Sequence, residues 1–147
     1  MAVREALLNV LVHREYSFRA STFISFYTDR IEFTSIGGLV SGVTLKDVMM
    51  GISVCRNVKL ANIFYRLELI EAYGTGILKI MEAYAGTGKD PQIETSDNVF
   101  KIILPKERGT FTRKDVEKML GFSQTTCGRL LNRVNSIIKD SKNPTIQ

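Results

Sequence analysis

Apolar side chains near the start of the chain recur every three or four residues, which is the spacing of an amphipathic helix. The positions concerned are Val3, Ala6, Leu7, Val10 and Leu11. We therefore predict a helix over residues 2–14. No capping residue or strand precedes it, so we expect a segment cut from a longer protein.

Two segments rich in Phe, Ile, Tyr and Thr follow, at residues 22–27 and 30–35. These residue types favour β-strands, and the Thr28-Asp29 pair between the segments is suited to a turn. The pattern predicts an antiparallel hairpin. Three glycines within residues 36–42 predict that the second strand ends in a loop.

Helical periodicity returns three times in the middle of the chain. Thr44, followed three residues later by Asp47, forms a capping box that predicts a short helix over residues 45–51. A second helix is predicted over residues 56–67 and a third over residues 77–84.

Residues 86–98 contain glycine, proline and small polar residues, so we predict that they form a loop. The apolar run from Val99 to Leu104 predicts a strand that Pro105 ends. Helices mixed with mostly antiparallel strands indicate an α+β sandwich rather than a doubly wound parallel sheet.

The charge of the chain is uneven. Residues 1–100 contain ten Lys and Arg against eleven Asp and Glu, whereas residues 101–147 contain ten against four. The whole formal net charge of +5 therefore comes from the last third of the chain. A positive end of this kind favours contact with a polyanion, although basic helices are often simply solvated.

Two helices are predicted within this basic end, separated by Gly121-Phe122-Ser123. A capping box at residues 112–115 opens the first helix, and the serine of the turn caps the second. Two helices about a tight, glycine-containing turn are typical of a helix-turn-helix. We divide the chain into a domain over residues 1–104, a linker over residues 105–109 and a small helical segment over residues 110–147.

The second of these helices carries polar side chains opposite its apolar stripe, as a helix that enters the major groove of DNA does. The candidate DNA-binding residues are Lys114, Gln124, Thr125, Thr126, Arg129 and Arg133. The segment resembles a winged helix that is incomplete, because no wing follows Ile138. A two-helix packing appendage that does not touch DNA is the alternative.

Composition excludes several classes of protein. With 44% apolar and 24% charged residues the chain is not a disordered one, and no apolar run approaches the ~20 residues of a membrane span. We expect a soluble, cytoplasmic protein. Cys55, Cys127 and the sole histidine, His13, lie in unrelated contexts, so we expect reduced thiols and neither a zinc site nor a Cys–His couple.

Three polar residues interrupt the apolar pattern of the first helix. Glu5, Asn9 and His13 are spaced four residues apart and therefore form one polar stripe. A carboxylate and an amide one turn apart can hold Mg²⁺ and orient a water, as nucleotide hydrolysis requires. Alternatively, the three side chains lie at the solvent edge and cap neighbouring loops.

Gly86-Thr87-Gly88-Lys89 resembles the end of a phosphate-binding P-loop. That motif requires glycine and a hydroxyl residue at the positions of Ala83 and Asp90, and it requires a strand where we predict a helix. We therefore expect no helicase motor in this chain.

Four segments occur in the order in which they occur in one known family: Arg4–Tyr16, Arg30–Leu39, Arg56-Asn57 and Gly74–Ile77. Together they resemble the C-terminal domain of RecG-type helicases, over about residues 2–104. That domain is similar to the GHKL class of ATPases, so the resemblance implies an α/β sandwich with a mostly antiparallel sheet. Full-length relatives carry an upstream AlbA/Schlafen-type DNA-binding domain, and we expect one here.

The resemblance implies roles for two groups of residues. Glu5 would activate water and Asn9 would hold Mg²⁺. The glycines whose backbones would meet the nucleotide are Gly37, Gly38, Gly74 and Gly76. ATP with Mg²⁺ is the cofactor that follows from these roles.

Two positions depart from the pattern of the family. Ser35 replaces the aspartate that accepts the adenine amino proton, and Leu39 replaces the second glycine of the same box, with Gly38 displaced by one residue. Loss of that carboxylate costs about 2–3 kcal/mol, roughly a 30- to 150-fold loss of affinity. We therefore expect a degenerate domain that does not hydrolyse ATP.

The leading hypothesis is a fragment of a DNA-binding transcription regulator. Its ATPase-like domain would be a sensor or dimerisation scaffold, and its partners would be double-stranded DNA and further copies of the chain. One alternative is a functional ATP-binding module of the GHKL type that controls DNA binding. A ligand-free oligomerisation scaffold is the second alternative.

Overall fold

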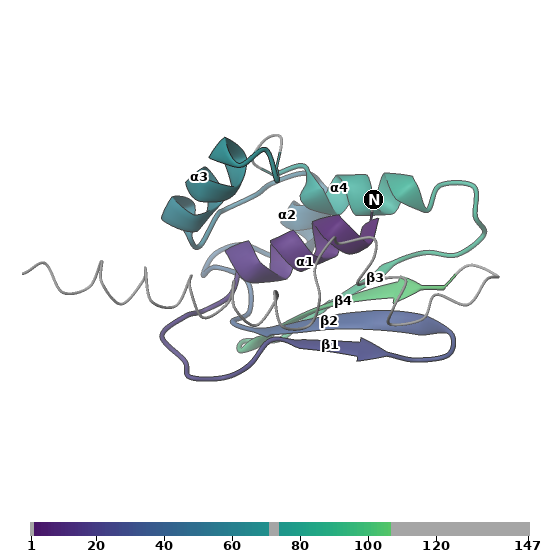
Figure 1. Ribbon diagram of the computed structural model, residues 1–147, viewed down its shortest axis with the longest axis horizontal. Helices are drawn as coiled ribbons and strands as arrows, with labels where there is room; N and C mark the ends of the chain where they lie inside the picture. Colours follow the sequence, from purple (N-terminus) through teal and green to yellow (C-terminus); the bar gives the residue numbers. More distant parts are fainter. Residues whose placement is uncertain (1, 71–73, 107–147) are drawn as a thin grey trace, which may run out of the picture. The chain divides into compact units, whose positions relative to one another are not determined.

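The computed structural model describes residues 2–70 and 74–106. They form an α+β fold in which helices cover one face of a four-stranded antiparallel sheet (Figure 1), so the predicted fold class is confirmed. The strands, in the order β1-β2-β4-β3, are β1 (Phe23–Phe26), β2 (Arg30–Ile36), β4 (Val99–Pro105) and β3 (Gln92–Thr95). The helices are α1 (Ala2–Val12), α2 (Leu45–Met49), α3 (Val58–Arg66) and α4 (Gly76–Ala83).

By internal contacts the chain divides into two compact units, Met1–Thr110 and Phe111–Gln147. The described residues belong to the first unit. The predicted helix-turn-helix, with the incomplete winged helix and its DNA-binding candidates, lies outside the described residues.

The sheet is built around the pairing of β2 with β4. The predicted hairpin of β1 and β2 is confirmed, with the Tyr27 amide donating to the Arg30 carbonyl at 2.9 Å across the turn. The register places Phe33 opposite Ile102 and Ile31 opposite Leu104, and all four side chains are buried. These aliphatic and aromatic residues form the sheet side of the core.

Helix α1 packs against β2 and β4 on one side and against α4 on another. Its buried residues are Ala2, Ala6, Leu8, Val10 and Val12. They lie on more than one face of the helix, as expected for a helix enclosed between a sheet and a second helix. From α4, Ile77 and Ile80 complete this inner layer.

Three helices are shorter than predicted, and the one predicted over residues 56–67 is α3, which spans Val58–Arg66. Helix α1 ends at Val12 rather than at residue 14, because the Glu15 amide instead pairs with the Ile36 carbonyl at the end of β2. The capping box at Thr44 opens α2 as predicted, but the helix ends at Met49. Gly51 then adopts a φ of +95°, which a helix does not contain.

The prediction of an uninterrupted loop over residues 86–98 was wrong, since it contains β3. The sequence of β3 has a single apolar residue, Ile93, and so shows no alternating pattern. Pairing with β4, in which Ile93 lies opposite Ile102, makes this segment a strand. A tertiary contact decides its conformation.

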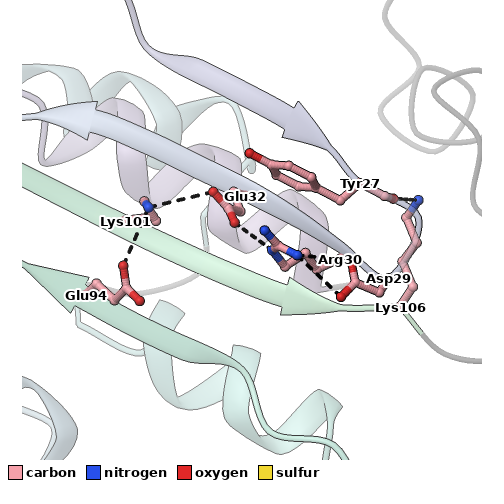
Figure 2. A network of polar contacts seen from close by, with 7 residues as sticks. All are labelled: Tyr27, Asp29, Arg30, Glu32, Glu94, Lys101 and Lys106. Carbon is pink, nitrogen blue, oxygen red and sulfur yellow. Dashed lines mark hydrogen bonds and ion pairs between the residues drawn. The ribbon is translucent and has the colours of Figure 1, made fainter.

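The face of the sheet opposite the helices carries a ladder of charges (Figure 2). Glu32 on β2 accepts a 2.7 Å contact from Arg30 and lies 3.7 Å from Lys101 on β4, which lies 3.5 Å from Glu94 on β3. Opposite charges on neighbouring strands stabilise their register. This ladder crosses three strands and is part of the frame that holds the site on the other face.

Candidate functional site

Two adjoining hollows lie between α1, the start of α4 and the loops that follow β2 and α2. Their volumes are about 70 and 50 Å³. The residues that line both are Asn9, His13, Ser53, Gly74 and Gly76. Segments far apart in the sequence therefore meet at one place.

The polar stripe of α1 faces these hollows. Asn9 and His13 line both, and Glu5 lines the smaller one. Within the described part of the chain, the side chains of Asn9 and His13 form no hydrogen bond.

The Gly74–Gly76 box lies directly against this stripe. Gly74 has a φ of +88°, and a Cβ there would lie 2.8 Å from the Ser53 Cβ. A Cβ on Gly76 would lie 2.9 Å from the Asn9 Nδ2 atom and 3.5 Å from the Glu5 Oε2 atom. Glycine at position 76 lets the first turn of α4 approach the carboxylate and the amide of α1, and glycine at position 74 lets the preceding loop approach Ser53.

The other glycine pair is engaged within the fold. The Gly37 amide donates to the Asn98 carbonyl at 2.8 Å, and the Gly38 amide donates to the Asp97 carbonyl at 3.2 Å. Gly38 lines the larger hollow, whereas Gly37 lies against Glu15. The structure thus brings four of the five candidate cofactor-binding residues together, namely Asn9, Gly38, Gly74 and Gly76.

Arg56 and Asn57 join the segments around the hollows, a role that the sequence did not reveal. Arg56 donates to a Glu15 carboxylate oxygen at 2.7 Å and to the Gly38 carbonyl at 2.8 Å. Asn57 donates from its Nδ2 atom to the carbonyls of Val12 and Arg14, both at 2.7 Å. The available signal was an arginine–asparagine pair at the start of a predicted helix.

Burial and nearby polar groups shift the pKa values of two titratable groups at the site. Burial, and to a smaller extent the nearby Arg56 guanidinium, lower the pKa of His13 below its ordinary value of 6.5. Hydrogen bonds from Ser17, and further the contact with Arg56, lower the pKa of Glu15. The two shifts favour the neutral form of the imidazole and the ionised form of the carboxylate.

Ser35 is buried, with 2% of its surface exposed, and its hydroxyl has no hydrogen-bond partner. It lies opposite Phe100, which lines the larger hollow. Among the described residues, the lining of that hollow contains no carboxylate. Its aliphatic wall is formed by Leu39, Val40, Val43, Val48, Ile52 and Val54.

The larger hollow, as the structure holds it, is small for an adenine nucleotide. A volume of about 70 Å³ is several-fold below the ~300–1,000 Å³ of typical small-molecule sites. In the described ranges, no group of three His, Cys, Asp or Glu side chains is placed to hold a metal ion.

The remaining candidates lie elsewhere. Lys114, Gln124, Thr125, Thr126, Arg129 and Arg133 fall outside the described residues, as does Cys127. Cys55 lines the smaller hollow as a free thiol, and burial raises its pKa. Over residues 2–70 and 74–106, no helix is long and apolar enough to cross a membrane.

The described fold is similar to a solved structure, the DIP2311 protein from Corynebacterium diphtheriae. The TM-score is 0.66 and the identity is 24%, and the match covers 75% of this chain but 24% of that protein. The chain therefore spans about a quarter of the length of that protein, and the likeness concerns the fold alone. No curated protein matches the chain.

A family model described as "Putative ATP-dependent DNA helicase recG C-terminal" matches residues 20–104, more than half of the chain. The match includes Ser35, the Arg56-Asn57 pair and the Gly74–Gly76 box. It begins after α1, which contributes Glu5 and Asn9 to the same hollows. The chain belongs to this family of ATPase-like, RecG C-terminal domains.

Proposed function

We propose that this chain is part of a DNA-binding transcription regulator in the cytoplasm, and that its ATPase-like domain is a sensor or dimerisation scaffold without ATP turnover. The observation that carries the second part is Ser35. At the position of the adenine-reading carboxylate this protein has a buried hydroxyl without a partner.

Two further observations support a degenerate site. The amides of Gly37 and Gly38 are already donated to backbone carbonyls, so a nucleotide would have to displace those bonds. The wall of the larger hollow is aliphatic, and its volume suits a few small atoms rather than a purine with its ribose. Such a hollow favours a small ligand or none.

Isothermal titration of the full chain with ATP and Mg²⁺ tests this part of the proposal. We expect millimolar binding at best and no hydrolysis above background. Asn9→Ala is the informative variant, and Gln92→Ala, an exposed amide on β3, is its matched control. Micromolar affinity that Asn9→Ala abolishes and Gln92→Ala preserves would contradict the degenerate site.

The proposed DNA-binding part rests on the basic residues 110–147. Lys114, Arg129 and Arg133 supply cations for phosphates, and Gln124, Thr125 and Thr126 supply groups that hydrogen-bond base edges. In the whole protein this segment would act with an upstream AlbA/Schlafen-type domain. The partner is double-stranded DNA.

Fluorescence anisotropy with a labelled duplex at low salt tests the DNA-binding part. Arg129→Glu combined with Arg133→Glu should abolish binding. The control combines Lys59→Glu with Arg66→Glu, which makes the same change in net charge on exposed positions of α3. Equal loss of DNA affinity in both double variants would contradict a specific role of residues 110–147 in DNA binding. A lack of DNA binding by the unmodified chain would contradict it as well.

A functional ATP-binding module is the second candidate, and one observation favours it. The start of α4 lies within contact distance of both Asn9 and Glu5, which places helix amides beside an amide and a carboxylate. The same titration separates the two candidates, because this module requires tight, Asn9-dependent binding of ATP.

A further inference from the structure

One edge of the sheet has the features of a pairing surface. Among the described residues, β1 pairs with β2 alone and forms one edge of the sheet, at the bottom of the view in Figure 1. An edge strand presents unpaired amides and carbonyls, and natural proteins usually protect such an edge with charges, proline or a bulge.

The opposite edge, β3, is protected in this way. Pro91 precedes it, Lys89 and Asp90 lie just before it, and Glu94 lies within it. The strand β1, with the sequence Phe-Ile-Ser-Phe, contains neither charge nor proline, and its register with β2 is unbroken. The two edges of the sheet therefore differ, because β3 is protected by charges and proline and β1 is not.

Aromatic side chains lie exposed along the β1 edge. The exposed fractions are 61% for Phe23, 37% for Phe26 and 41% for Tyr27. Phe18, in the segment that leads to β1, is 50% exposed. Aromatic residues gathered at an unprotected edge are typical of a surface that another molecule covers.

The hydrogen bonding of the hairpin shows which amides point outward. Because the Tyr27 amide donates to the Arg30 carbonyl, alternation along the strand directs the backbone of Ser25 and Phe23 toward β2. The backbone amides and carbonyls of Ile24 and Phe26 then point away from the sheet. They are available to a neighbouring strand.

We propose that β1 pairs antiparallel with β1 of a second copy of this chain, about a two-fold axis at Ile24. Registers that place outward-pointing residues opposite one another satisfy the backbone groups, and those centred on Ile24 and on Ser25 overlap the strand equally; we choose the one centred on Ile24 because it also matches the charges that flank the strand. The two sheets then continue as one across the dimer. This inference rests on the proposed function. It identifies β1 as the surface through which the domain would act as a dimerisation scaffold.

The same register brings opposite charges together at both ends of the paired strands. Arg19 precedes β1 and Asp29 follows it, both are exposed, and each lies five residues from Ile24. Antiparallel pairing about Ile24 therefore places Arg19 of one copy level with Asp29 of the other, just beyond the ends of the paired strands. Figure 2 shows Asp29 at the turn, beside Arg30 and Tyr27. A second copy is thus complementary in charge as well as in backbone hydrogen bonding.

The register also defines a sharp experiment, because it places Phe23 opposite Ser25 of the second copy. Position 25 lies opposite Glu32 on β2, so a lysine there is compatible with the fold. In a Ser25→Lys background, Phe23→Glu creates two attractive pairs across the axis and Phe23→Lys creates two repulsive pairs. The two double variants differ at one side chain only, and both lose the same aromatic ring.

Sedimentation equilibrium of the full chain over a concentration series gives the mass of each species, with circular dichroism to verify folding. We expect the unmodified chain and the Phe23→Glu, Ser25→Lys variant to reach the mass of a dimer. The Phe23→Lys, Ser25→Lys variant should remain monomeric.

A chain that is monomeric at every concentration would overturn the proposal, as would two double variants with equal dimer content. Neither result depends on DNA, so the anisotropy titration still decides the DNA-binding function separately.

Discussion

Burial affects the individual residues of the site in different ways. His13 lies on the polar stripe of α1, yet it is enclosed enough for burial to lower its pKa. Ser35 is almost fully buried and leaves its hydroxyl without a partner. Both features are consequences of packing, because a histidine or serine in isolation has neither.

His13 makes stability depend on pH. Since its pKa is lower in the folded protein than the ordinary value of 6.5, the unfolded chain binds a proton more readily as the pH falls below 6.5. We expect the free energy of unfolding to fall between pH 7 and pH 5, by at most about 1.4 kcal/mol per pH unit.

Urea unfolding at several pH values in this range tests the prediction. His13 is the only histidine, so His13→Gln should remove most of the slope. The lowered pKa of Glu15 adds its own loss only below about pH 4.5, outside the series. An unchanged slope in His13→Gln would refute the assignment.

The burial of Ser35 predicts the effect of placing at this position the aspartate that the family carries there. Ser35→Asp places a buried carboxyl where no partner is present, so its pKa should be raised and its charged form should destabilise the fold by about 3 kcal/mol at pH 7. The penalty is absent below the unfolded pKa, near pH 3.9, grows as the pH rises from there to the folded pKa, and is constant above the folded pKa.

Thermal unfolding of Ser35→Asp at pH 5 and at pH 7 measures this penalty. Ser35→Ala is the control, because it removes a hydroxyl that makes no hydrogen bond and should change stability by less than about 1 kcal/mol. If Ser35→Asp is as stable as the unmodified chain at pH 7, the position is open to solvent or to a partner group.

At the scale of elements, the end of α1 depends on the start of α3. Carbonyls at a helix C-terminus have no partner within the helix. The Asn57 side chain satisfies two carbonyls at this end, those of Val12 and Arg14. One side chain thus joins two helices, through residues 45 positions apart in the sequence.

We expect Asn57→Ala to lower the free energy of unfolding by about 1–3 kcal/mol, because it leaves two part-buried carbonyls without a donor. Asn57→Asp should cost at least as much, since a carboxylate cannot donate. Chemical denaturation measures both, and Lys59→Ala, exposed on the same helix, should change stability by less than about 0.5 kcal/mol. Equal stability of all three variants would show that water replaces Asn57.

At the scale of the whole molecule, the separation of charge predicts how DNA binding responds to salt. The net charge of +5 comes from residues 101–147, so phosphate contacts should concentrate there. If about four cations engage phosphates, the logarithm of affinity should fall with the logarithm of salt at a slope near −3.6. Anisotropy titrations at four salt concentrations measure the slope. A slope near zero would exclude phosphate contacts as the source of binding.

The hydrophobic pattern predicted most elements of the described domain. It located α1, the β1–β2 hairpin, α3, α4 and β4 to within a few residues, because each has a regular apolar period of its own. The capping box of α2 was equally visible. The strand β3 was missed because a single isoleucine carries no period, and its pairing with β4 makes it a strand.

The sequence likewise predicted one part of the candidate site and missed another. The spacing of Glu5, Asn9 and His13 put them on one face of a helix, and the family resemblance implied that the backbones of Gly74 and Gly76 meet a nucleotide. The close approach of Gly76 to Asn9 was not visible, because it joins segments 67 positions apart. Arg56 and Asn57 were noted as a motif, but their partners lie on other elements.

The sequence by itself determined the fold class, the positions of most helices and strands, the polar stripe of α1 and the concentration of positive charge near the C-terminus. These properties depend on periodicity and composition, which are local. Tertiary structure alone decided that β3 is a strand, that burial lowers the pKa of His13, that the Ser35 hydroxyl is unpartnered and that the amides of Gly37 and Gly38 are occupied. Each of these depends on which distant segment packs against the residue, and packing is a property of the whole fold.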